Sequence, residues 1–153
     1  MSFAIHSPAF AEGTSMPRKY TLDGENLSPP LNWSDPPRGT RSFAIVCEDP
    51  DAPSGVFRHW ALCNIAADQD GVPEGAGNVR SRELLVGRND FGHHRYDGPQ
   101  PPKGHGVHHY HFRIAALDAE RIDLSPDQNA ADLWKAVKPH ILAEAETIAT
   151  YQR

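Results

Sequence analysis

Prolines and glycines recur at short intervals through residues 1–118, so few segments there are long enough for a helix. The chain has 14 prolines and 12 glycines among 153 residues, and clusters such as 26–30 and 35–39 have the composition of loops. Turn clusters with apolar runs between them favour short strands. A chain of this length fits one domain, and we expect a single domain over residues 1–153.

Several segments between the turns have the patterns of strands. Ser42–Asp49 alternates between two faces, and Asp49 lies on an apolar one. Phe57–Ile65 is apolar on both faces, as expected of a buried central strand. Val107–Leu117 is rich in aromatic and β-branched residues, which favour strands. Arg80–Val86 is predicted to form a further short strand.

The chain from residue 125 to residue 149 is predicted to be helical. Ser125 can cap a helix and Pro126 suits its first position. Pro139 interrupts the helical spacing, so a second helix is expected from Pro139 to Ala149. Strands followed by helices indicate a mainly β (α+β) fold, in which antiparallel or mixed sheets carry short peripheral and C-terminal helices.

The charge of the chain is negative overall but uneven. Lys and Arg number 15 against 20 Asp and Glu, which gives a net charge of −5. The segment Arg80–Arg113, in contrast, holds six basic residues and three acidic ones. This density is too low for a nucleic-acid surface. A mildly basic, histidine-rich middle segment in an acidic chain indicates a small-anion site. The alternative is a solvated surface with uneven charge.

Three absences in the sequence bear on the compartment. No apolar stretch approaches the ~18 residues of a membrane span. The N-terminus lacks the charged and apolar regions of a signal peptide. Cys47 and Cys63 are too few for a disulfide scaffold. We therefore expect a cytoplasmic protein without integral membrane association.

Nine histidines occur, and six of them lie between His93 and His111. In a strand over Val107–Leu117, alternation places His108 and Tyr110 on the apolar, inward face. His109 and His111 then point outward. An inward His108 can be interpreted in two ways. It is either a ligand-binding residue or a core histidine whose ring is hydrogen-bonded to a backbone group.

Strand alternation also predicts that Asp49 points inward. A buried Asp49 carboxylate needs a charged or hydrogen-bonding partner, and His59 lies in the buried strand beside it in sequence. A pair between Asp49 and His59 would satisfy both. The alternative is that Asp49 only caps the following turn, a structural role for which Asp51 is the better candidate.

The density of histidines between His105 and His111 suggests a metal site as a further interpretation, because neutral imidazole suits zinc or nickel. Strand alternation sends His108 and His109 to opposite faces. His109 and His111 could share a face, but no third ligand is identified. We therefore predict no metal site.

Four blocks of sequence, spread over nearly the whole chain, share their order and spacing with one known family. They are Asn26–Trp33; DPDAP at Asp49–Pro53 with Gly55 and His59–Trp60; Tyr96–Gly104 with Gly106, His108 and Tyr110; and Leu142–Glu146 with Thr150, Tyr151 and Arg153. These blocks resemble the phosphatidylethanolamine-binding protein (PEBP) family, in particular its bacterial and archaeal Raf kinase inhibitor-like branch. The last block is similar to the C-terminal helix and tail of that branch.

The resemblance implies a PEBP-like antiparallel β-sandwich with a pocket for a small anionic ligand, either phosphate or a phospholipid headgroup. Carried over by position, its ligand-binding residues are Asp49, Pro53, His59, Pro101, Pro102, His108 and Tyr110. The resemblance implies a non-enzymatic regulator without a cofactor, and it is compatible with a homodimer. It assigns no role to His93 and His94.

Two other functions are kept as alternatives. One is inhibition of a protease or a kinase, a protein partner that would be bound through the surface rather than the pocket. The other is phosphoester hydrolysis, with Asp49, His59 and His108 as an acid/base group. The sequence lacks an obvious nucleophile beside these three residues, and no motif supports Cys47 or Cys63 in that role.

Overall fold

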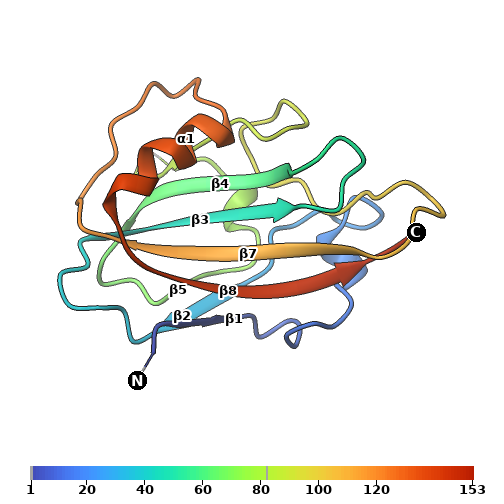
Figure 1. Cartoon of the computed structure of the whole chain (residues 1–153), viewed down its shortest axis with the longest axis horizontal. Helices are drawn as coiled ribbons and strands as arrows, with labels where there is room; N and C mark the ends of the chain where they lie inside the picture. The colour runs from blue at the N-terminus through green and yellow to red at the C-terminus, as the bar shows by residue number, and fades with distance from the viewer. Residues whose placement is uncertain (1, 82) are drawn as a thin grey trace.

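The computed structural model describes residues 2–81 and 83–153, and within them two antiparallel sheets form the body of the protein (Figure 1). The smaller sheet has the order β1 (Ala4–His6), β2 (Leu31–Ser34) and β5 (Gly71–Val72). The larger sheet has the order β6 (Leu85–Val86), β4 (Phe57–Ala66), β3 (Ser42–Asp49), β7 (His108–Leu117) and β8 (Ile141–Tyr151). The prediction of a mainly β, antiparallel fold is confirmed.

The three longest predicted strands are confirmed almost residue for residue. β3 has the predicted bounds, β4 extends one residue beyond Ile65, and β7 begins one residue after Val107. The predicted strand Arg80–Val86 is reduced to β6, and Arg82 lies outside the described residues.

The predicted second helix, Pro139–Ala149, is wrong, because this segment forms β8 after a short 3₁₀ turn at Lys138–His140. β8 pairs with β7 along its whole length, from Leu117 opposite Ile141 to His108 opposite Tyr151. Its side chains alternate in exposure, so the Ala- and Glu-rich composition that favours a helix is overridden by pairing with β7. The block that resembles a C-terminal helix is therefore a strand.

The one α-helix in the described residues, α1 (Ala130–Val137), begins later than predicted. Its N-cap is Asn129, whose side chain accepts a hydrogen bond from the backbone N–H of Asp132 at 2.8 Å. The predicted cap, Ser125, instead lies in the preceding turn, where its hydroxyl accepts from the N–H of Asp127 at 3.3 Å. Two other 3₁₀ turns lie at Arg18–Tyr20 and Ala76–Asn78.

β3 is the centre of the core because both of its faces are buried. On one face Phe43 packs against Trp33 of the smaller sheet, with ring centroids 5.3 Å apart. On the other face Val46 belongs to the cluster that includes Trp134 of α1. A fully buried large apolar side chain stabilises a fold by roughly 1.5–3 kcal/mol, so two apolar layers hold β3 in place.

The outer edge of β8 is partly covered by the chain near the N-terminus. The backbone N–H of Gly13 donates to the carbonyl of Ile148 at 2.8 Å, and that of Met16 donates to Thr150 at 2.7 Å. Thr150 in turn donates to the carbonyl of Thr14 at 2.9 Å. Backbone groups in the second half of the edge strand are therefore hydrogen-bonded.

The end of β3 and the starts of β4 and β7 meet at one end of the larger sheet, on the right in Figure 1. This follows from antiparallel pairing, which brings Asp49 opposite Phe57. The loops 50–56 and 98–107 leave from the same end. The polar residues of the DPDAP and PPKG blocks are thereby brought together although about 50 residues separate them in sequence.

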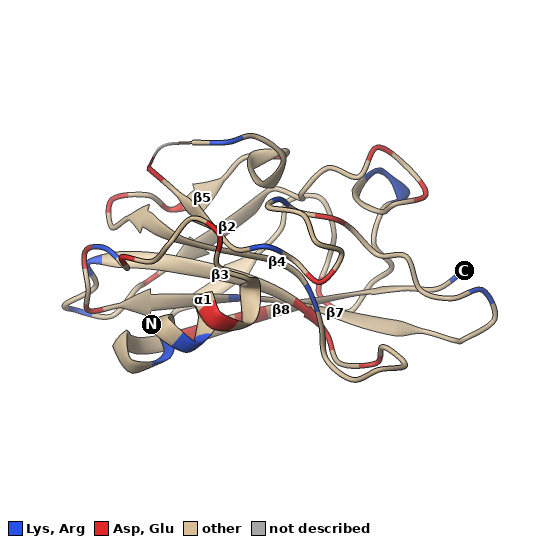
Figure 2. Cartoon of the chain, turned by 90° about the horizontal axis from the view of Figure 1, so that it is seen from above, with Lys and Arg blue, Asp and Glu red and all other residues tan. Residues whose placement is uncertain are grey.

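In the part of the chain that the structure describes, Lys and Arg are interspersed with Asp and Glu over the loops, α1 and the strands, and Figure 2 shows no continuous basic face among them. In the described chain, no helix has the length and apolar character needed to cross a membrane.

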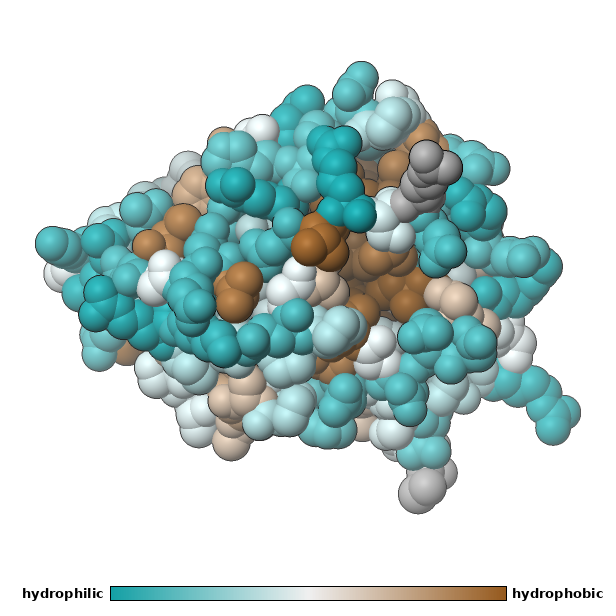
Figure 3. Space-filling view, turned by 180° about the vertical axis from the view of Figure 1, so that it is seen from behind, coloured by the Kyte–Doolittle hydropathy of each residue, from teal (hydrophilic) through white to brown (hydrophobic). Residues whose placement is uncertain are grey.

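A broad hollow of about 820 Å³ lies between β5 and the segment that precedes β6. Ile65, Val72 and Leu84 contribute to its lining, and Figure 3 shows hydrophobic side chains gathered in a depression on that side of the molecule. This hollow and the pocket at the sheet end have no described lining residue in common.

Candidate functional site

A pocket of about 260 Å³ lies at the end of the larger sheet where β3, β4 and β7 meet. All seven ligand-binding residues predicted from the family resemblance line this pocket. The structure brings them together from three strands and two loops. The lining is completed by five residues that were not nominated, which are Ala52, Ser54, Phe57, Phe91 and Gln100.

His108 and Asp49 form a buried pair on the strand side of the pocket. His108 Nδ1 lies 2.7 Å from Asp49 Oδ2, and both residues are almost fully shielded from solvent. The other carboxylate oxygen of Asp49 accepts the backbone N–H of Asp51 at 2.8 Å. Asp49 therefore both caps its turn and pairs with a histidine, and the predicted pair between Asp49 and His59 is wrong.

The outward orientation predicted for His109 and His111 is confirmed. His109 Nδ1 lies 2.8 Å from the carboxylate of Asp51, and His111 Nδ1 lies 3.2 Å from that of Glu146. Burial by itself raises the pKa of Asp51, but its hydrogen bonds with His109 outweigh that effect and lower the pKa. The prediction that Asp51 is the better candidate for capping the turn is wrong, because Asp49 caps it.

His105 is a neighbour of the pocket that the sequence did not single out as a site residue. Its Nδ1 lies 2.6 Å from Nε2 of His108. Because His108 Nδ1 donates to a carboxylate, Nε2 of the neutral ring accepts a hydrogen bond from Nδ1–H of His105. Gly104 and Gly106 flank His105 with φ of +74° and +97°, a backbone that L side chains rarely adopt. Both nitrogens of His108 are thus engaged.

His59 approaches the pocket from β4 and is held by a different kind of partner. Its Nδ1 lies 2.7 Å from the backbone carbonyl of Asp97, and a carbonyl only accepts, so Nδ1 carries a proton. The ring packs edge-on against Tyr110 and Phe91, with centroids 5.2 and 5.4 Å away. Burial lowers the pKa of His59 in spite of the nearby carboxylates. The ring is therefore neutral at pH 7.

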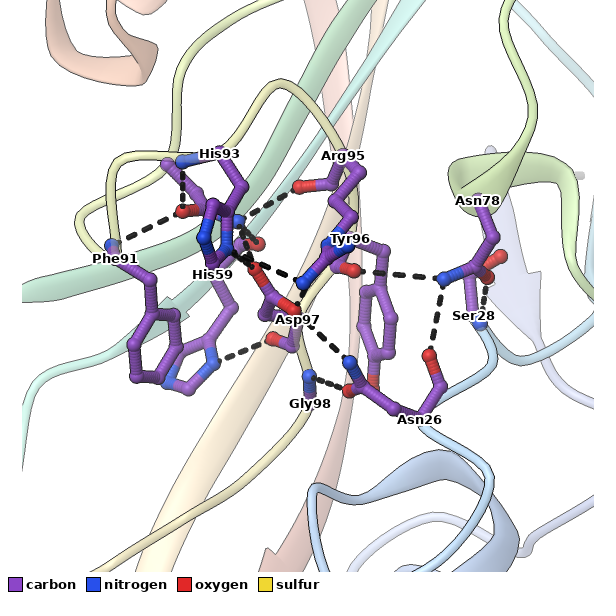
Figure 4. Close-up of polar contacts among 11 residues, drawn as sticks. Asn26, Ser28, His59, Asn78, Phe91, His93, Arg95, Tyr96, Asp97 and Gly98 are labelled. Carbon is purple, nitrogen blue, oxygen red and sulfur yellow. Dashed lines mark hydrogen bonds and ion pairs between the residues drawn. The ribbon is translucent and has the colours of Figure 1, made fainter.

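The Asp97 carbonyl is positioned by the buried carboxylate of the same residue (Figure 4). Asp97 Oδ1 accepts from Asn26 at 2.9 Å and Arg95 at 3.1 Å, while Oδ2 accepts from Asn89 at 2.9 Å and lies 2.7 Å from His93 Nδ1. Burial alone raises the pKa of Asp97, but these hydrogen bonds and the charge of Arg95 outweigh it and lower the pKa.

This network gives His93 a structural role that the sequence left open. His93 bonds to Asp97, whereas His94 lies in a separate hollow of about 240 Å³ with Arg80 and Pro126. The sequence signal for the network was weak, because Asn26 and Asp97 lie 71 positions apart.

The hydroxyl of Tyr110 is buried and has no hydrogen-bond partner in the described part of the chain. Burial also raises its pKa, so the group stays protonated and is able to donate. A buried hydroxyl without a partner costs about 1–3 kcal/mol. It is a polar group of this pocket that a ligand can satisfy.

The pocket has no Lys or Arg among its described lining residues, and most of the lining is apolar. Among the described residues, no cluster of three or more His, Cys, Asp and Glu is arranged to hold a metal. Burial raises the pKa of the thiols of Cys47 and Cys63, so both stay protonated. The chemistry available to the pocket is hydrogen bonding and proton exchange by imidazole.

The chain has clear relatives. A model of the family described as phosphatidylethanolamine-binding protein matches residues 6–152. A UPF0098 protein from Methanothermobacter thermautotrophicus is 43% identical over 152 residues, which cover 97% of this chain and 98% of the relative. A second, from Aquifex aeolicus, is 39% identical over 97% of this chain and 88% of its own length.

A solved structure shows the same architecture. The crystal structure of YbcL from Escherichia coli, described as a new member of the mammalian PEBP family, superposes with a TM-score of 0.93 at 33% identity. The superposition covers 99% of this chain and 98% of YbcL. The family match, the sequence relatives and the common fold agree. The chain belongs to the phosphatidylethanolamine-binding protein family.

Proposed function

We propose that the pocket binds a small phosphate-type anion, free or as the headgroup of a lipid, and that the protein acts as a non-enzymatic regulator. The observation that carries this proposal is the buried hydroxyl of Tyr110, which lacks a partner in the described chain and borders the pocket. Buried polar groups are nearly always hydrogen-bonded, so an orphaned donor in a pocket points to a ligand acceptor.

The size and lining of the pocket support the same ligand class. A volume of about 260 Å³ admits a phosphate group with a short substituent. Pro53, Phe57, Phe91 and Pro101 supply an apolar wall for that substituent. Tyr110 then donates to an anion oxygen, which is a stronger hydrogen bond than one between neutral groups.

Removing only the hydroxyl of Tyr110 tests the proposal. We expect Tyr110→Phe to weaken binding of inorganic phosphate and phosphoethanolamine by about 10-fold, the loss of one hydrogen bond to a charged group. Isothermal titration calorimetry measures the change. The control is Tyr151→Phe, which removes a hydroxyl that bonds to Asp23 at 2.8 Å.

Two results would contradict the proposal. One is that neither phosphate compound binds at millimolar concentration, and the other is that Tyr110→Phe binds as well as the parent. Unfolding in urea should show Tyr110→Phe to be more stable than the parent by about 1–3 kcal/mol, because the hydroxyl it removes is buried and unpaired.

Binding without turnover is part of the proposal, and hydrolysis of phosphoesters is its alternative. The pair of Asp49 and His108 resembles an acid/base unit, and Ser54 is a hydroxyl among the lining residues. We expect no turnover of phosphomonoesters or diesters. Turnover that disappears in His108→Ala would establish the hydrolase instead.

The proposal places the protein in a reducing compartment such as the cytoplasm. The two cysteines are free and buried, as is usual where thiols are kept reduced.

A further inference from the structure

The pocket at the end of the larger sheet does not account for the basic middle of the sequence. The segment Arg80–Arg113 holds six basic residues against three acidic ones, yet that pocket has no Lys or Arg among its described lining residues. Arg95 and Arg113 are paired with carboxylates elsewhere. Arg80, in contrast, lines the separate hollow of about 240 Å³ that also contains His94. We call this second cavity the β6 hollow.

Three segments of the chain form the walls of the β6 hollow. Arg80, Ser81, Leu84 and β6 belong to the first segment, His94 to the second and Pro126 to the third. Backbone hydrogen bonds connect these segments. The N–H of Asn89 donates to the carbonyl of His93 at 2.7 Å, and the N–H of Arg88 donates to the carbonyl of Gln128 at 2.8 Å. The β6 hollow and the pocket at the sheet end have no described lining residue in common.

His94 contributes a buried ring nitrogen without a partner. The two adjacent histidines differ in this respect, because His93 turns toward the carboxylate of Asp97 (Figure 4). Nε2 of His94 is shielded from solvent and has no hydrogen-bond partner in the described part of the chain. Buried polar atoms are nearly always paired, so this nitrogen points to a ligand in the hollow that the ring lines. With a proton on Nε2, the ring donates to such a ligand.

The charge of the β6 hollow favours an anion. Arg80 is its one permanently charged residue, and no carboxylate occurs among the lining residues that the structure describes. Glu83, from the same segment of the chain, lines the broad hollow beside β5 instead. A guanidinium group without a carboxylate in its own cavity attracts a ligand anion. The hydroxyl of Ser81 is a further donor.

The shape and lining of the hollow narrow the class of anion. The planar fork of a guanidinium matches the two oxygens of a carboxylate, and one positive charge balances a monoanion rather than a dianion. Leu84, β6 and Pro126 form an apolar wall that suits an aliphatic chain. A volume of about 240 Å³ is smaller than the roughly 300–1,000 Å³ of cavities for drug-sized ligands, so the chain is short.

We propose that the β6 hollow is a second binding site, which takes a small monocarboxylate with a short branched aliphatic chain. One carboxylate oxygen accepts from Nε2 of His94, Arg80 pairs with the carboxylate from the exposed rim, and the chain packs against Val86 and Pro126. This inference goes beyond the proposed phosphate-binding function. It stands or falls separately, because the two cavities share no described lining residue.

Three probes at pH 7.5 and constant ionic strength test the ligand class. The first is isovalerate, whose carboxylate is ionised at this pH. Isovaleramide, its neutral counterpart, should bind about 10-fold more weakly, because hydrogen bonds to a charged group are lost. Acetate lacks the aliphatic chain and should also bind about 10-fold more weakly, because less apolar surface is buried. NMR titration measures the three affinities from the ring signals of His94 and the amide signal of Val86.

Two variants test the proposed donors. Arg80→Gln removes the charge and should weaken isovalerate by about 10-fold. Arg41→Gln is the matched control, because Arg41 is an exposed arginine that pairs with Glu120 away from the β6 hollow. His94→Phe should weaken isovalerate by a similar factor, with the amide of Val86 as the reporter. Urea denaturation should show no loss of stability in His94→Phe, because the nitrogen it removes is already unpaired.

A further variant and a further probe separate this site from other sources of binding. Tyr110→Phe should weaken phosphate and leave the affinity for isovalerate unchanged. N-acetylleucine presents the same carboxylate and branched chain as the C-terminus of a peptide. It should bind more weakly than isovalerate, because its acetylated backbone exceeds the small hollow.

Four results would overturn the inference. The first is that isovalerate causes no saturable shift of the His94 ring signals at millimolar concentration. The second is that isovaleramide binds as tightly as isovalerate, and the third is that Arg80→Gln binds isovalerate as well as Arg41→Gln does. The fourth is tighter binding of N-acetylleucine, which would assign the hollow to a chain terminus. If His94→Phe does not fold, the parent protein and Arg80→Gln still decide the question.

Discussion

The two buried histidines of the pocket are held by partners of different charge. His108, on the β7 side, has an ionisable carboxylate at 2.7 Å, whereas His59, on the β4 side, has a backbone carbonyl at the same distance. A carboxylate attracts a positive ring, and a carbonyl only orients a neutral one. One side of the pocket is therefore a buried pair of a histidine and a carboxylate, and the other is a neutral histidine fixed in one tautomer by a carbonyl.

The two sides also differ in what supports them. Asp49 and His108 reach each other directly from neighbouring strands. His59 depends on a loop whose position is set by Asp97 and the groups that donate to its carboxylate. We therefore expect a substitution on the first side to break the pair of Asp49 and His108. A substitution on the second side should instead change the orientation of His59.

The largest expected effect comes from breaking the buried pair of His108 and Asp49. We expect His108→Ala to lower the free energy of unfolding by about 3–5 kcal/mol, because it leaves the Asp49 carboxylate buried without its partner. Urea denaturation measures the loss. The control is His109→Ala, which breaks the exposed contact between His109 and Asp51 and should change stability by less than ~1 kcal/mol. If both variants lost similar amounts of unfolding free energy, the buried pair would stabilise the fold no more than the exposed one.

A somewhat smaller effect is expected on the His59 side. Asp97→Ala should destabilise by about 2–4 kcal/mol, because several donors lose their shared acceptor. It should also weaken the binding of phosphate, since the carbonyl that orients His59 in the pocket is displaced. Asp68→Ala, which removes an exposed acidic side chain, is the control. Unchanged phosphate affinity in Asp97→Ala would show that the network does not align His59.

Acid should weaken the fold through His59 first. In the unfolded chain His59 gains a proton near its ordinary pKa of 6.5, but in the folded protein it does so only at lower pH. The unfolded state then binds more protons, so stability falls as pH drops below about 6.5. Asp97, also with a lowered pKa, adds a second loss below about pH 3.8.

Denaturant titrations between pH 7.5 and 3 resolve these two losses. His59→Gln should remove the first loss and retain the second. A parent protein whose stability is constant between pH 6.5 and 5 would show that His59 is not held neutral by burial.

The smallest expected effect concerns His105. His105→Ala removes the hydrogen-bond partner of Nε2 of His108 and leaves Asp49 in place. We expect it to lower the free energy of unfolding by about 0.5–1.5 kcal/mol, the value of one ordinary hydrogen bond. Urea denaturation at pH 7.5 is the measurement. A loss as large as that of His108→Ala would mean that the pair between His108 and Asp49 depends on His105.

Local patterns were sufficient to predict the strand side of the pocket. Period-two alternation placed Asp49, His108 and Tyr110 inward, and the bounds of β3 could be predicted because its apolar residues are contiguous. The family resemblance extended the set to the loop prolines and to His59. The placement of these residues in the pocket could be predicted because it depends on the alternation of residues next to them in sequence, or on a motif that contains them.

The features that were missed depend on distant residues. The partner of His59 is a carbonyl 38 positions away, and no sequence pattern indicates which backbone oxygen a ring will face. β8 looked helical because its alanines and glutamates favour helices, and only pairing with β7 makes it a strand. His105 was passed over because two positive-φ glycines, not periodicity, direct its side chain.

The cover on the edge of β8 has a consequence for self-association. An edge strand with free backbone groups is a template for adding another chain, and long edge strands are sites of aggregation. Backbone hydrogen bonds with Gly13, Thr14 and Met16 use these groups of β8 next to the end of the sheet that holds the pocket. Toward the start of β8, Glu144 and Glu146 are exposed instead. One half of the edge is thus protected by backbone pairing and the other by charge.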